Sequence, residues 1–98
     1  MRIIVLPAAR DDLRDIWRFG VITWGEAQAD RYSDTLDAAI NGLGVLPYMG
    51  PVVDDVSKGL RRLVVRSHLA FYRVDGDAVR IIRVLHGSRD AGRWVAQT

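Results

Sequence analysis

The sequence predicts an α+β domain in which an antiparallel helical hairpin packs on a four-stranded, mainly antiparallel sheet. Two apolar stripes with helical spacing occupy the first half of the chain. Three short runs rich in β-branched residues, separated by turns, occupy the second half, and another short run precedes the helices. Because 98 residues is the size of one ordinary domain, we predict a single domain over residues 1–98 with the element order β-α-α-β-β-β.

The first predicted strand, residues 2–6, ends at Pro7, which suits the first turn of a helix. Apolar residues then recur every three or four positions, and Asp and Arg residues occupy the opposite side. The apolar stripe consists of Ala9, Leu13, Ile16, Trp17 and Gly20. This pattern predicts an amphipathic helix that continues to about Thr23, before Gly25 turns the chain.

A second amphipathic helix is predicted to begin at Glu26 and to be closed by Pro47. Its apolar face is formed by Ala29, Tyr32, Leu36, Ala39, Ile40 and Leu43. Gly42 and Gly44 match no phosphate-binding loop, so we interpret them as fraying of the helix end. Since only a few residues connect the two helices, they must run antiparallel, and their combined apolar side needs a partner layer.

The second half of the chain is predicted to be a loop followed by a three-stranded meander. Residues 47–59 contain two prolines and two glycines, which indicates a loop. Strands are expected at 60–66, 69–74 and 78–86, and the Asp-Gly pair in 75–77 is typical of a tight hairpin. The apolar last strand is expected to be central. The pattern does not determine where the N-terminal strand joins, although an edge position beside the last strand would be economical.

The predicted core draws on both helices and on the last strands, because apolar residues are densest there. We expect mostly buried side chains at Leu13, Ile16, Trp17, Tyr32, Leu36, Leu43, Phe71, Ile82 and Val84.

Composition excludes several classes of protein and of site. The absence of cysteine excludes disulfides, thiolate metal sites and cysteine nucleophiles. No apolar run approaches the roughly 20 residues that span a bilayer, and the N-terminal run is too short for a signal peptide. We therefore expect a cytoplasmic protein with no membrane partner. His68 and His86 lie too far apart in sequence for metal-ligand spacing, so we predict no metal and no cofactor.

Charge is distributed unevenly along the chain. Residues 1–50 carry seven acidic and five basic side chains, whereas residues 51–98 carry five acidic and nine basic ones. The basic positions of the predicted sheet and tail are Arg61, Arg62, Arg66, Arg73, Arg80, Arg83, Arg89 and Arg93. They form either a solvated strand face or a positive groove for RNA phosphates or an acidic protein partner.

Polar side chains follow the last predicted strand, where a rigid element would present them to a partner. They are His86, Ser88, Arg89 and Asp90. A nucleophilic triad is disfavoured, because these residues share one local segment and a triad needs a base that reaches both of its partners. Trp94, beside Arg93, is either a tail residue folded on the core or an exposed anchor of the kind that dominates interfaces.

Five motifs, taken together, resemble the ParE branch of the ParE/RelE toxin superfamily over nearly the whole chain. They are Asp12-Leu13-x-x-Ile16-Trp17, Trp24-Gly25-x-x-x-Ala29, Gly59-Leu60-Arg61, Phe71-Tyr72-Arg73-Val74, and Ile82-Arg83-Val84-Leu85-His86-Gly87-x-Arg89-Asp90. The resemblance implies the toxin of a type II toxin–antitoxin pair, neutralised by a ParD-like ribbon-helix-helix antitoxin. It also implies DNA gyrase as the target, without an enzymatic activity of the toxin itself and without sequence-specific binding to nucleic acid.

RelE relatives are instead ribosome-dependent mRNA endonucleases, and that alternative stays open with His86, Arg61 and Arg83 as catalytic candidates. RNA cleavage needs proton transfer and positive charge at the phosphate. RelE-like enzymes often place a tyrosine near the C-terminus, whereas the tyrosines here are Tyr32, Tyr48 and Tyr72, and no lysine follows Lys58. These departures favour the ParE interpretation. A third alternative is an interaction domain without toxin activity.

We expect the target to contact the end of the last strand and the tail. Side chains there can engage a partner without supporting the core. The candidate target-binding residues are His86, Arg89, Arg93 and Trp94.

Overall fold

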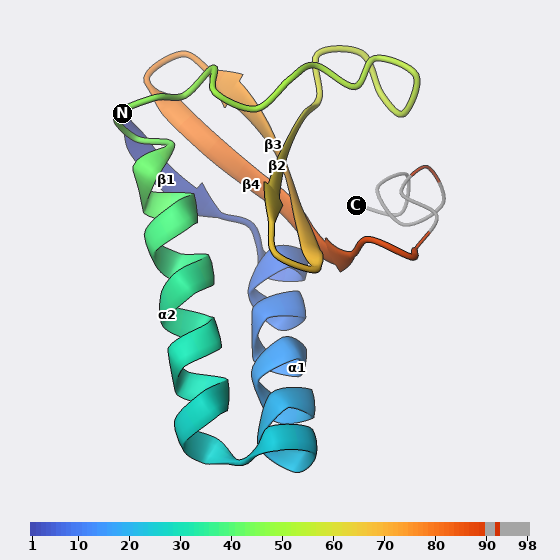
Figure 1. The fold of residues 1–98 in the computed structure, drawn as a ribbon. Coiled ribbons are helices and arrows are strands. Elements are labelled where there is room, and N and C mark those ends of the chain that lie inside the picture. The colour runs from blue at the N-terminus through green and yellow to red at the C-terminus, as the bar shows by residue number, and fades with distance from the viewer. Residues whose placement is uncertain (90–91, 93–98) are drawn as a thin grey trace.

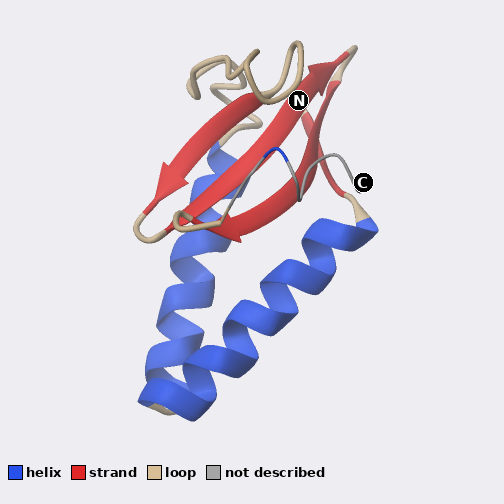
Figure 2. Ribbon diagram, turned by 90° about the vertical axis from the view of Figure 1, so that its right-hand side faces the viewer, coloured by secondary structure: helices blue, strands red, loops and turns tan. Residues whose placement is uncertain are grey.

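The computed structural model describes residues 1–89 and residue 92, and it shows a helical hairpin on one face of a sheet (Figures 1 and 2). The elements are β1 (Arg2–Val5), α1 (Pro7–Trp24), α2 (Glu26–Gly42), β2 (Arg61–Val65), β3 (His68–Asp75) and β4 (Ala78–His86). The α+β class and the predicted order of elements are confirmed. The hairpin extends past the sheet, so that the helix ends joined at Gly25 project from the body of the molecule (Figure 1).

The sheet has the strand order β1-β4-β3-β2. Strand β3 is antiparallel to both β2 and β4, whereas β1 runs parallel to β4 in a register that joins Arg2 to Ala78 and Val5 to Ile81. The predicted central position of the last strand is therefore confirmed, and the first strand takes the edge position beside it. Because β1 is short, it pairs with only the first part of β4.

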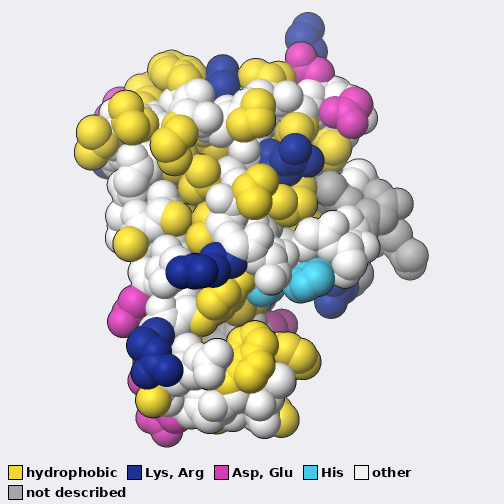
Figure 3. All heavy atoms as spheres, viewed as in Figure 1, with side chains coloured by type: hydrophobic (Ala, Val, Ile, Leu, Met, Phe, Trp, Pro, Cys, Tyr) yellow, Lys and Arg dark blue, Asp and Glu magenta, His cyan; other side chains and the backbone are white. Residues whose placement is uncertain are grey.

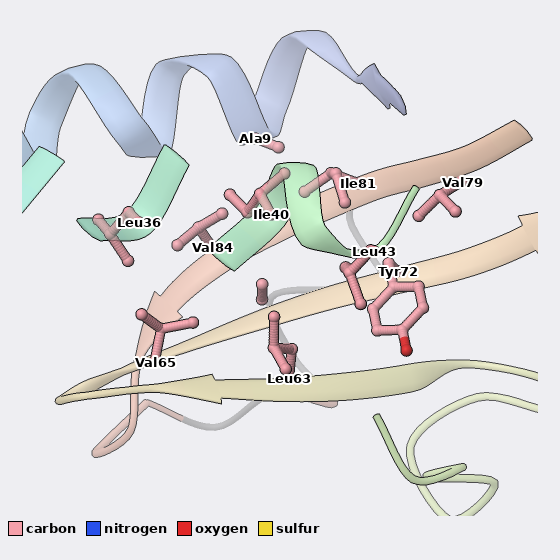
Figure 4. Packing of buried hydrophobic residues seen from close by; sticks show 11 residues of the cluster. Ala9, Leu36, Ile40, Leu43, Leu63, Val65, Tyr72, Val79, Ile81 and Val84 are labelled. Carbon is pink, nitrogen blue, oxygen red and sulfur yellow. The ribbon is translucent and has the colours of Figure 1, made fainter. Parts of the chain in front are cut away.

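The core has two parts, one on each face of the sheet. The larger part lies between the helices and the sheet and includes Leu36, Ile40, Tyr72 and Ile81 (Figure 4). A smaller part on the other face includes Phe71, Ile82 and Leu85, together with Val53 and Leu60 from the loop after α2. None of the predicted core side chains is exposed: Leu36, Leu43, Phe71, Ile82 and Val84 are buried, and Leu13, Ile16, Trp17 and Tyr32 are partly buried.

The end of α2 differs from the prediction. The helix stops at Gly42, and the following residues form a turn instead of a fraying helix end. The turn brings Gly44 against the N-terminal strand, since a Cβ atom at Gly44 would lie 2.8 Å from the backbone oxygen of Met1. The second glycine therefore permits a close approach between two chain segments.

Two further boundaries can be compared with the prediction. Strand β3 is longer than expected at both ends, since it includes His68 and Asp75. The predicted tail lies outside the described residues from 90 onward, apart from residue 92. No helix in the described part of the chain is long and apolar enough to cross a membrane.

Candidate functional site

A cleft of about 680 Å³ separates the projecting end of the helical hairpin from the ends of β3 and β4. Figure 3 shows it as a notch below the body of the molecule, with the histidine side chains at its rim. Helix α1 contributes Phe19 and Trp24, helix α2 contributes Tyr32, and the strands contribute His68 and His86. Its volume and its mixture of aromatic and polar side chains are typical of sites that bind a ligand or part of a partner.

The cleft lies where the second part of β4 has no strand neighbour on one side among the described residues. Beyond Ile81, where β1 ends, the helix α1 lies beside β4 instead of a strand. The carboxylate of Asp12 takes the place of a neighbouring strand and accepts a hydrogen bond from the backbone N–H of Val84 at 2.9 Å. A buried N–H without an acceptor is costly, so this contact stabilises the open side of the sheet.

Asp12 also binds Arg83 through a bidentate ion pair, with Nε–Oδ2 and Nη2–Oδ1 distances of 2.7 and 2.8 Å. Only 13% of the Asp12 side chain and 11% of the Arg83 side chain are exposed. The hydrogen bond to Asp12 raises the pKa of Arg83 above its ordinary value, although burial acts in the opposite direction. Arg83 therefore holds α1 against β4, and its charge is neutralised within the protein.

His68 and His86 face each other across β3 and β4 in the antiparallel register. Their ring centroids lie 5.4 Å apart with an angle of 88° between the planes. The sequence had indicated two distant histidines, so their contact corrects that interpretation. The described residues contain no group of three or more His, Cys, Asp or Glu side chains that could hold a metal ion.

The two imidazoles have different hydrogen-bond partners. Nδ1 of His68 lies 2.6 Å from the Tyr32 hydroxyl, a group that can both donate and accept. Nδ1 of His86 accepts from the backbone N–H of Ser88 at 3.2 Å and lies 2.8 Å from the Ser88 hydroxyl. Burial, and then the neighbouring His86, lower the pKa of His68 below its ordinary value of 6.5.

A continuous series of ring contacts joins the hairpin to the histidines. The centroid distances are 6.1 Å between Phe19 and Trp24, 6.3 Å between Trp24 and Tyr32, and 5.5 Å between Tyr32 and His68. Phe19 is 63% exposed and Trp24 is 49% exposed. Sequence reasoning missed these residues as a site. The signal was present at Phe19, a large apolar residue that lies off the buried stripe of its helix.

The structure separates the three candidates for RNA cleavage. His86 lies at the cleft, and Arg83 is bound to Asp12. Arg61 lies toward the other end of the sheet, where it pairs with Tyr72, donates to the carbonyl of Gly50 at 2.9 Å and stacks on Tyr48 at 5.0 Å from the ring centroid. The three side chains thus have separate surroundings and do not form one cluster.

The candidates for target binding are placed in part. His86 and Arg89 both line the cleft. Arg93 and Trp94 lie outside the described residues. The His86–Ser88 contact that a triad would need is present, but Asp90 also lies outside them.

Comparisons with known proteins agree on one family. The family described as "ParE toxin of type II toxin-antitoxin system, parDE" matches residues 3–91. Toxin ParE1 of Mycobacterium tuberculosis is 37% identical over 93 residues, which cover 94% of this chain and 95% of that protein. Toxin ParE1 of Caulobacter vibrioides is 43% identical over 83 residues, which cover 85% of each.

A solved structure described as "Chromosomal ParDE TA system from P. aeruginosa" contains a similar chain. The two chains superpose with a TM-score of 0.79 at 22% identity, and the match covers 88% of this chain and 95% of that chain. This likeness supports the fold.

Proposed function

Because this chain belongs to the ParE toxin family of type II toxin–antitoxin systems, we propose that it inhibits DNA gyrase and that a ParD-like ribbon-helix-helix antitoxin neutralises it. The proposed place of action is the bacterial cytoplasm. The toxin acts by binding and performs no reaction of its own. The main structural support is the position of His86 and Arg89, which line the cleft at the end of the central strand β4.

The surroundings of the basic residues support inhibition by binding over RNA cleavage. A ribonuclease must gather a proton-transfer group and positive charge around one phosphate. Here the Arg83 guanidinium is engaged by Asp12, and Arg61 is held by the loop after α2. His86 therefore lacks two of the basic partners that the catalytic alternative assigned to it. The target surface that we propose consists of His86, Arg89, Arg93 and Trp94.

The exposed apolar side chains support an antitoxin partner. Phe19, Ile22 and Trp24 are exposed on the hairpin, and the loop after α2 exposes Val45, Leu46, Tyr48 and Met49. Exposed apolar groups of this kind mark protein–protein contacts. An extended or helical acidic partner laid across them would bury this surface and pair with the arginines. We expect the toxin without its antitoxin to be poorly soluble and toxic to the cells that produce it.

Two assays run side by side test the proposed target. Purified toxin is added to gyrase in a supercoiling assay and to ribosomes in a translation assay that follows mRNA cleavage. We expect supercoiling to be inhibited while the mRNA stays intact. Intact supercoiling together with mRNA cut at the ribosome would overturn the proposal and make His86, Arg61 and Arg83 catalytic candidates again.

Substitutions at the strand end test the proposed surface. Interface Arg and Trp anchors contribute about 2 kcal/mol or more to binding, so Arg89→Ala or Trp94→Ala should raise the toxin concentration needed for inhibition by roughly 30-fold. Arg80→Ala is the matched control, because Arg80 is a partly exposed arginine in the first part of β4, where it pairs with Asp75. Equal losses in all three variants would contradict a specific surface at the strand end.

A further inference from the structure

We propose that the cleft binds an extended segment of gyrase, which adds as a short parallel strand to the open edge of β4. The open edge is the side of residues 82–86 that faces away from β3. This inference rests on the proposed function, because His86 and Arg89 of the proposed target surface line the cleft, and gyrase is assigned as the source of the segment for that reason.

The register of β3 and β4 determines which backbone groups reach the open edge. His68 faces His86, and the N–H of Gly87 donates to the carbonyl of Ser67 at 2.9 Å. This bond identifies His68 and His86 as a non-hydrogen-bonded pair of the antiparallel ladder, in which N–H and C=O point away from the partner strand. Val84 lies two residues before His86, so its backbone groups point the same way.

Two of these four backbone groups are already used. The N–H of Val84 donates to Asp12, and the carbonyl of His86 accepts from the N–H of Arg89 at 3.0 Å. The carbonyl of Val84 and the N–H of His86 have no hydrogen-bond partner among the described residues. Both residues line the cleft. Unpaired groups of this kind on a strand edge are a template for a further strand.

The spacing of the two groups suits a parallel segment. In a parallel ladder, one residue of the added strand donates to the carbonyl before its partner and accepts from the N–H after it. The carbonyl of Val84 and the N–H of His86 stand in this relation around Leu85. Strand β1 is already parallel to β4 on the same edge, where Leu6 donates to the carbonyl of Ile81 at 3.0 Å. The gyrase segment therefore continues the ladder that β1 begins.

The faces of the sheet determine which side chains the segment needs. Leu85 belongs to the core on the outer face of the sheet, and Val84 belongs to the core under the helices. Because successive side chains of a strand alternate between faces, the two neighbours of the residue opposite Leu85 point toward the helices. There the cleft is lined by Ile16 and by the exposed rings of Phe19 and Trp24. The segment thus has apolar side chains at these two positions, while its backbone bonds supply affinity.

Proline at position 86 tests the backbone bond. Proline has no N–H, and at an edge position whose N–H points away from the neighbouring strand it leaves the ladder intact. His86→Pro and His86→Ala both remove the imidazole, but only His86→Pro removes the backbone donor. In a supercoiling assay we expect His86→Pro to inhibit gyrase about tenfold more weakly than His86→Ala, because the carbonyl of the segment loses its donor inside the interface.

Val64 of β2 supplies the matched control for proline. The N–H of Arg62 bonds to the carbonyl of Pro51 at 3.1 Å, so the N–H of Val64, two residues later, also points away from β3. Val64 is exposed and does not line the cleft. Val64→Pro and Val64→Ala should therefore inhibit gyrase equally. Thermal unfolding followed by circular dichroism checks that all four variants are folded.

Hydrogen exchange in the wild-type toxin is a second test, which decides the question even if His86→Pro fails to fold. Mass spectrometry follows the peptide that covers residues 84–88, with and without purified gyrase. We expect the N–H of His86 to exchange readily in the free toxin. Binding of gyrase should protect about one further amide in this peptide.

The outcomes distinguish this inference from the proposed function. Equal inhibition by His86→Pro and His86→Ala, or no added protection on binding, would overturn the inference and leave gyrase inhibition intact. Slow exchange of His86 in the free toxin would assign the edge to the chain's own residues, and protection by the antitoxin but not by gyrase would assign it to the antitoxin; each result overturns the inference. An absence of binding and of supercoiling inhibition by the wild type would overturn the proposed function as well.

Discussion

The two halves of β4 differ in what lies beside them. Residues 78–81 have β1 on one side and β3 on the other, and the nearby ion pair Arg80–Asp75 is solvent-exposed. Among the described residues, 82–86 have a strand neighbour only in β3, and on the other side the mostly buried carboxylate of Asp12 accepts a hydrogen bond from the Val84 N–H. A single side chain thus replaces part of a strand, and because it occupies less space than a strand, a cleft remains beside it.

The largest expected effect is the loss of Asp12. Asp12→Ala removes the bidentate carboxylate that binds Arg83 and the acceptor of the Val84 N–H. We expect the free energy of unfolding to fall by about 3 kcal/mol or more, measured by urea denaturation. The control is Asp77→Ala, which removes an exposed pair with Arg2 and should cost about 1 kcal/mol or less. The double variant Asp12→Ala/Arg83→Leu should recover part of the loss. Similar losses for Asp12→Ala and Asp77→Ala would show that Asp12 does not specifically stabilise residues 82–86 of β4.

The next effect concerns residues 78–81 of β4, where Ile81 pairs with Tyr72 of β3. Its buried hydroxyl accepts a hydrogen bond from the Gly50 N–H at 2.9 Å and so fixes the loop after α2. Tyr72→Phe should lower the free energy of unfolding by about 2 kcal/mol, because the buried N–H loses its acceptor. Tyr48→Phe, on the exposed ring that covers Arg61, should change it by less than about 0.5 kcal/mol. Equal changes in urea denaturation would refute this difference.

In the cleft beside residues 82–86 of β4, we expect a smaller effect on stability but a large effect on gyrase inhibition. Trp24→Ala removes a half-exposed ring from the cleft wall, so the free energy of unfolding should change by no more than about 1 kcal/mol. Inhibition of gyrase supercoiling should weaken at least about tenfold. Ile22→Ala is the control, since Ile22 is 86% exposed on the same hairpin and does not line the cleft. If both variants inhibit gyrase as well as the wild type does, the cleft wall takes no part in inhibition.

The smallest expected effect is a dependence of stability on pH. Because folding lowers the pKa of His68 below 6.5, the unfolded chain binds this proton more readily. The stabilisation is therefore fully present above pH 6.5 and is lost as the pH falls toward the lowered pKa. We expect the midpoint of urea denaturation to decrease on acidification through this range, less so in His68→Gln. An identical decrease in both proteins would assign the effect to other groups.

Much of the fold could be predicted because its signals are local. The stripe from Ala9 to Gly20 and the turn at Gly76 depend on neighbours within a few residues. The contact between His68 and His86 was missed because it depends on a register shift. Tyr72 pairs with Ile81 but Phe71 pairs with Arg83, so Ile82 is an extra residue in β4. Without this bulge His68 would face Leu85. No feature of the sequence near residue 82 indicates the bulge.

The candidate site was predicted correctly at His86 and Arg89 but not at Arg83. Both outcomes follow from how far each signal reaches along the sequence. His86 and Arg89 follow a recognisable strand, so their position was accessible from sequence. The pairing of Arg83 with Asp12 joins residues 71 positions apart, and no periodicity connects them. From the sequence alone, Arg83 on its predicted strand was therefore a candidate for contact with a substrate, whereas in the fold it forms an internal ion pair with Asp12.

The central place of β4 has a consequence for how the protein folds. Strand β4 is the last of the described strands to leave the ribosome, yet it separates β1 from β3 and contacts α1. The helical hairpin needs only local contacts and can form early, whereas the sheet must wait for a segment that closes a loop of more than seventy residues with β1. We expect the nascent chain to stay incomplete, with its hairpin apolar face uncovered, until β4 has been synthesised. The cleft, which the end of β4 lines, is therefore expected to form late in folding.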